Sequence, residues 1–165
     1  MNIGLNNAVV PPSTLQEWLD CFDYMKTNKI DQDFLGIIEN GSFEYDEKIK
    51  EHFQGHLVDT VNYMLEKYSK RFSKELNYSL ELNDFADTYK LFLVFKRDIS
   101  NCLFFNSFGF LRDEVKQALH QDIKNKMTDY WQNVILFLHQ QSTEVDNDDL
   151  EDAIYLIKRI KLFPQ

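Results

Sequence analysis

From position 13 to position 163 the chain contains no proline, and this absence constrains its fold more than any other feature. The three prolines are Pro11, Pro12 and Pro164, and only five glycines occur in the 165 residues. Proline and glycine are the residues that most often end helices and form tight turns. A chain that lacks them through its middle therefore favours long helices.

Apolar residues recur at intervals of three and four along most of the chain, which is the period of an amphipathic helix. The most regular stripe consists of Ile49, Phe53, Leu57, Val61, Met64, Leu65, Tyr68 and Phe72. Stripes of this kind predict six helices, at about residues 14–26, 31–39, 46–76, 84–104, 111–141 and 147–162. Ser13 and Gln16 are expected to form the capping box of the first helix. Gly55 is expected to mark a close approach between helices.

The two longest predicted helices would each span about 45 Å and must bury their apolar stripes against other helices. We therefore expect an all-α fold, namely a single elongated antiparallel helical bundle of about six helices. The sequence contains no internal repeat and no low-complexity linker. Residues 1–165 are accordingly expected to form one domain, in which residues 1–12 are a flexible N-terminal segment.

The charge of the chain restricts its partners. Asp and Glu number 27 against 18 Lys and Arg, which gives a net charge of −9. Because a negative surface repels phosphate backbones and anionic lipids, we expect no binding to nucleic acid or membrane, and a basic protein partner is favoured. The N-terminus shows no signal-peptide pattern, no apolar run is long enough to span a membrane, and Cys21 and Cys102 form no CxxC motif. A cytoplasmic location with reduced cysteines is therefore expected.

Negative charge is concentrated in the segment STEVDNDDLEDA, residues 142–153. Its six acids are Glu144, Asp146, Asp148, Asp149, Glu151 and Asp152. A calcium loop is disfavoured, because counting from Asp146 places Leu150 at a ligand position and no glycine follows. Two other interpretations can hold together. The acids can open a helix whose positive end they stabilise, and they can form a docking surface for a basic partner.

The segment FFNSFGF, residues 104–110, places four phenylalanines around a turn. They either plug the end of the bundle, or one or two of them stay exposed as anchors in a protein interface. Phe105 and Phe108 are therefore candidate partner-binding residues together with the six acids.

His52 and His56 stand four residues apart, a spacing that zinc sites on helices use. Both are predicted to lie away from the apolar stripe, whereas a metal site inside a bundle projects its ligands inward. We therefore expect no metal and no cofactor. GxSxG, P-loop and GxGxxG motifs are absent, so no enzymatic activity is expected. Cys21 follows Asp20, and negative neighbours raise the pKa of a thiol, which disfavours a nucleophile.

These features together favour an acidic, non-enzymatic binding protein. In size and charge the chain resembles the immunity and antitoxin proteins with which bacteria neutralise basic nuclease toxins. The resemblance implies an inhibitor that covers the active site of a toxin or nuclease domain, acting as a monomer or weak homodimer. The alternatives are a metal-binding helical bundle that uses His52 and His56, and a structural or adaptor protein that acts through self-association.

Overall fold

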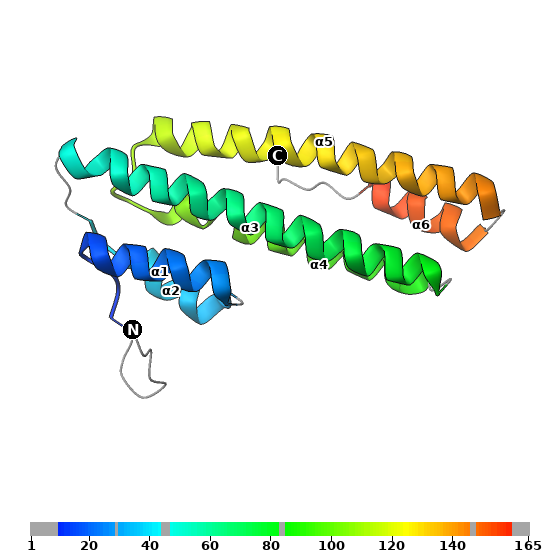
Figure 1. Ribbon diagram of the computed structural model, residues 1–165, viewed down its shortest axis with the longest axis horizontal. Helices are drawn as coiled ribbons and strands as arrows, with labels where there is room; N and C mark the ends of the chain where they lie inside the picture. The colour runs from blue at the N-terminus through cyan, green and yellow to red at the C-terminus, as the bar shows by residue number, and fades with distance from the viewer. Residues whose placement is uncertain (1–9, 29, 44–46, 83–84, 146–147, 160–165) are drawn as a thin grey trace. The chain divides into compact units, whose positions relative to one another are not determined.

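The computed structural model describes residues 10–28, 30–43, 47–82, 85–145 and 148–159 (Figure 1). Within these ranges the chain forms six α-helices and no strand, so the predicted all-α helical bundle is confirmed. The helices are α1 (Leu15–Thr27), α2 (Gln32–Glu39), α3 (Glu47–Glu81), α4 (Phe85–Asn101), α5 (Asp113–Val145) and α6 (Asp148–Lys158). A 3₁₀-helix, η1 (Phe104–Ser107), follows α4 and lies within residues 104–110, the segment that the sequence places at a turn.

The chain forms two compact units, and neither is a continuous stretch of sequence. Unit 1 comprises residues 1–66 and 101–117, and unit 2 comprises residues 67–100 and 118–165. Helices α3 and α5 each pass from one unit into the other without a break. The prediction of one elongated domain stays a prediction. Most of the segment that was expected to be flexible, residues 1–9, lies outside the described residues.

Helix α1 begins with a capping box, one residue later than the sequence pattern indicated. Thr14 has an extended backbone, with φ −112° and ψ 158°, and its hydroxyl accepts a hydrogen bond from the backbone N–H of Glu17 at 3.3 Å. The Glu17 carboxylate accepts from the backbone N–H groups of Ser13, at 2.8 Å, and Thr14, at 3.0 Å. The predicted pair of Ser13 and Gln16 is therefore wrong. These backbone hydrogen bonds lower the pKa of Glu17.

The core of unit 1 is aromatic and centres on Trp18, which is fully buried. The Trp18 ring centre lies 4.7 Å from that of Phe108, 5.4 Å from that of Phe110 and 6.0 Å from that of Phe53. The indole N–H donates to the carbonyl oxygen of Ser42 at 3.0 Å. Because a buried indole N–H needs an acceptor, this bond ties the segment between α2 and α3 to α1.

The two glycines at positions 41 and 55 lie in opposite environments. A methyl group on Gly41 would stand 2.5 Å from Cζ2 and 2.8 Å from Cη2 of Trp18. A methyl group on Gly55 would have no neighbour within 4 Å, and Gly55 is exposed. The expectation that Gly55 marks a close helix approach is therefore wrong. The close approach is at Gly41, where backbone passes over the tryptophan ring.

In unit 2, α3 and α4 form an antiparallel hairpin. The Phe72 ring of α3 lies 4.5 Å from Phe95 of α4, while Ser79, two turns further along α3, hydrogen-bonds Thr88 at 3.2 Å. Positions later in α3 thus pair with positions earlier in α4. Trp131 of α5 stacks on the same group of rings, 6.3 Å from Phe95.

The hairpin also contains an ion pair that periodicity did not predict. The Arg71 guanidinium of α3 bonds the carboxylate of Asp98 on α4. The Asp98 side chain is 8% exposed and that of Arg71 is 43% exposed. The guanidinium also lies 5.5 Å from the centre of the Tyr68 ring. A nearly buried carboxylate thus has its charge matched by a side chain from the other helix.

Candidate partner-binding surface

Helix α6 has one buried face and one exposed face. The buried face consists of Leu150, Ala153, Ile154 and Ile157, none of which is more than 5% exposed. Figure 1 shows α6 beside the C-terminal part of α5, which belongs to the same unit. At about 100° per residue these four positions fall on one side of the helix. The opposite side of α6 is exposed and can contact another molecule.

The acidic segment divides between two helices. Asp148, Asp149, Glu151 and Asp152 all lie in the first five residues of α6, and Asp148, Glu151 and Asp152 are exposed. Asp146 lies outside the described residues. Lys158 occupies the last turn of α6. Acids at the start of a helix and a base at its end both interact favourably with the helix dipole and so stabilise the helix. This arrangement is the one that the helix-start interpretation requires.

Glu144 does not fit the helix-start interpretation. It lies in the last turn of α5, which ends at Val145 and carries no basic residue in that turn. An acid near the negative end of a helix is unfavourable by typically about 0.3–1 kcal/mol. The helix-start interpretation therefore applies to the acids of α6 and not to Glu144.

Two apolar side chains stand exposed beside the α6 acids. Tyr155 is 60% exposed and Leu156 is 44% exposed. We define the α6 outer face as Asp148, Glu151, Asp152, Tyr155 and Leu156.

The two apolar members of this face, Tyr155 and Leu156, are not among the partner-binding residues expected from the sequence. A rotation of about 100° per residue places Tyr155 opposite the buried stripe, so the signal was present. The guanidinium of Arg159 lies 5.3 Å from the Tyr155 ring centre, and its Nη1 donates to the phenolic oxygen at 3.3 Å. These contacts hold the ring against the helix surface.

Phe105 and Phe108 do not lie at any exposed surface. They are 0% and 1% exposed, and Phe108 packs against Trp18 inside unit 1. The expectation that one or two phenylalanines of this segment stay exposed as anchors is therefore wrong for this pair. Short-range sequence alone does not separate a buried aromatic cluster from an exposed one, because both place phenylalanines around a turn.

The described residues contain no group of three or more His, Cys, Asp or Glu side chains arranged to hold a metal ion. Burial, together with the nearby charges of Asp20 and Glu17, raises the pKa of Cys21 to about 11. The thiol is thus protonated at neutral pH, as its acidic neighbours indicated. Cys102 is fully buried.

Comparisons of the chain with protein-family models, with curated proteins and with solved structures find no match. Among the helices in the described ranges, none combines the length and apolar character that crossing a membrane requires. A function for the α6 outer face is therefore argued from the chain's own residues alone.

Proposed function

We propose that this protein is a non-enzymatic binding protein whose α6 outer face docks a basic protein. The observation that carries the proposal is the combination on one helix face of three exposed acids with exposed Tyr155 and Leu156. Stabilisation of the helix start explains the acids, but it does not explain the exposed apolar pair.

The two kinds of side chain supply different parts of an interaction. Negative charge attracts a basic partner from a distance and raises the association rate. Tyrosine is enriched among the residues that contribute most to binding, because it buries a large area with few rotatable bonds. A partner with a basic rim and an apolar contact point would therefore match the α6 outer face.

Inhibition of a basic toxin, such as a nuclease, is the form of this function that we favour. The net charge of −9 and the length of 165 residues support it, because they resemble those of immunity and antitoxin proteins. In this mechanism the carboxylates occupy the positions where a nuclease binds phosphates. The inhibitor then covers the active site and needs no chemistry of its own.

The test is affinity capture from the source cell, followed by association kinetics with the purified partner at several salt concentrations. A triple variant, Asp148→Asn, Glu151→Gln and Asp152→Asn, is expected to bind more slowly, because charge on the rim acts on the association rate. A second variant, Tyr155→Ala, is expected to dissociate faster. A nuclease assay of the captured protein then shows whether binding inhibits it.

The matched control is Glu51→Gln, Glu81→Gln and Asp129→Asn, which removes the same charge from three exposed acids on α3 and α5. If this control slows association as much as the α6 variant, only the net charge matters and the α6 outer face is not the site. An association rate that does not fall as salt rises contradicts the electrostatic argument. A captured partner that has no hydrolytic activity contradicts the proposal that the protein is a nuclease inhibitor.

A further inference from the structure

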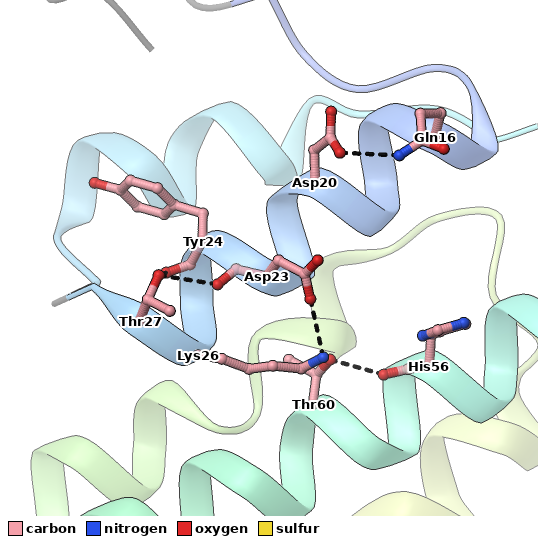
Figure 2. A network of polar contacts seen from close by, with 8 residues as sticks. All are labelled: Gln16, Asp20, Asp23, Tyr24, Lys26, Thr27, His56 and Thr60. Atoms are coloured by element: carbon pink, nitrogen blue, oxygen red, sulfur yellow. Dashed lines mark hydrogen bonds and ion pairs between the residues drawn. The ribbon is translucent and has the colours of Figure 1, made fainter. Parts of the chain in front are cut away.

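A pair of imidazole rings lies on the surface of α3, within unit 1. His52 is exposed, His56 is half-buried, and their ring centres are 4.6 Å apart with the ring planes at 81°. The backbone oxygen of His56 accepts a hydrogen bond from the Thr60 hydroxyl at 2.7 Å. Figure 2 shows that the His56 ring extends away from the neighbouring ion pair of Lys26 and Asp23. Both histidines belong to α3, which is one helix from Glu47 to Glu81.

The separation of the two rings matches that of two ligands on one metal ion. Imidazole nitrogen binds zinc at about 2.0–2.1 Å, so two imidazoles on one ion place their ring centres about 4.5–5 Å apart. Because His52 is exposed, it can rotate toward the metal without displacing core side chains. We propose that His52 and His56 form a surface chelating site for a divalent transition-metal ion such as Zn²⁺ or Cu²⁺.

The surroundings of the pair determine what kind of site this is. Among the described residues no third His, Cys, Asp or Glu joins the pair in an arrangement that could hold a metal. Water completes the coordination, as it does at open metal positions. The net charge of −9 favours a cation at the surface. Imidazole suits zinc, copper and nickel, and among these Cu²⁺ binds most tightly to a given set of ligands.

The first experiment is a calorimetric titration of the full, tag-free chain with Zn²⁺. One ion per chain is expected, with loss of binding in His52→Ala and in His56→Ala. His139→Ala is the control, because His139 has no histidine three or four residues away in the sequence.

Moving one histidine along the helix tests the geometry at constant composition. His56→Ala with Gly55→His creates a pair at i, i+3, which stays on one face and is expected to restore binding. His56→Ala with Asp59→His creates a pair at i, i+7, separated by about 10.5 Å along the helix, which is too far for one ion. Both positions are exposed, so each variant is expected to fold.

Helical circular dichroism of every variant checks that a loss of binding is not a loss of fold. Absence of saturable Zn²⁺ binding to the natural chain overturns the proposal. Equal affinity in the i, i+7 variant, or loss of binding in His139→Ala, shows that the ion binds elsewhere and overturns it as well. The site lies on a different helix from the α6 outer face, so neither result depends on partner binding.

Discussion

At the scale of single residues, Gly41 lies against a buried tryptophan, whereas Gly55 lies on the open surface of a helix. A methyl group on Gly41 would enter the space of the Trp18 ring, which is fully buried and held by a hydrogen bond to Ser42. The same methyl group on Gly55 would touch nothing within 4 Å. Identical substitutions are therefore expected to have opposite effects.

We expect Gly41→Ala to lower the free energy of unfolding by about 1–3 kcal/mol, because an overpacked core must shift to admit the methyl group. Gly55→Ala is expected to raise it by up to about 1 kcal/mol, because alanine loses less backbone entropy in a helix. Urea denaturation of each variant beside the natural chain measures both changes. A stabilising Gly41→Ala would show that Trp18 moves freely, contrary to its packing.

At the scale of helices, the α3–α4 hairpin depends on a charge pair whose partners are unequally exposed. Asp98 is nearly buried, whereas Arg71 is not, and Arg97 reaches the other carboxylate oxygen at 3.8 Å from an exposed position. Removing Arg71 takes away the short ion pair of the nearly buried Asp98 carboxylate and leaves the longer contact with Arg97. Removing a cation at the surface changes little.

Arg71→Ala is therefore expected to destabilise the protein by about 1–3 kcal/mol. Arg97→Ala, the neighbouring control, is expected to change stability by no more than about 1 kcal/mol. Thermal or urea denaturation compares the two. In the double variant Arg71→Ala with Asp98→Ala, the loss is expected to be smaller than the sum of the single losses, because the buried charge is also gone. Additive losses would argue against a direct interaction.

The helix ends show where sequence reasoning succeeds and where it stops. The prediction of residues 31–39 as a helix agrees closely with α2, because its apolar spacing and the Asn40–Gly41 stop are both visible in the sequence. Helix α3 continues to Glu81, past the predicted end at residue 76, and α5 continues to Val145, past residue 141.

In both extended helices a buried serine continues the core-facing stripe. Ser79 is bonded to Thr88 across the hairpin, and Ser142 is bonded to the carbonyl oxygen of His139. The apolar stripe in the sequence stops before such residues, because serine is polar. Its burial depends on a hydrogen bond, and the apolar pattern does not reveal the partner of that bond. The Arg71–Asp98 pair was not predicted, because its partners are 27 residues apart in the sequence. The acids of the α6 outer face could be predicted from the concentration of negative charge in residues 142–153. Their exposed apolar neighbours, Tyr155 and Leu156, were not predicted.

At the scale of the whole molecule, two units share two unbroken helices. Each unit contains one of the two tryptophans, Trp18 in unit 1 and Trp131 in unit 2. Because α3 and α5 run through both units, unfolding of one unit removes helical turns that continue into the other. We expect the units to unfold together in a single transition.

Single-tryptophan variants test this expectation. In Trp131→Phe the fluorescence reports on unit 1, and in Trp18→Phe it reports on unit 2. Within each variant, the urea midpoint from fluorescence is expected to equal the midpoint from helical circular dichroism. Comparing two probes in one variant removes the effect of the substitution on stability. Two separated midpoints in either variant would show that the units unfold independently.

The interleaving of the two units also sets an order on the ribosome. Unit 1 lacks residues 101–117 until they have been synthesised, and unit 2 lacks α6 until the last part of this sequence has emerged. Residues 67–100 are therefore made before the part of α5 that covers Phe92 and Phe95 exists. At synthesis rates of about 5–20 residues per second, Phe92 and Phe95 remain for a few seconds without their α5 neighbour Trp131. During that interval we expect the nascent chain to present a hydrophobic surface of the kind that chaperones bind.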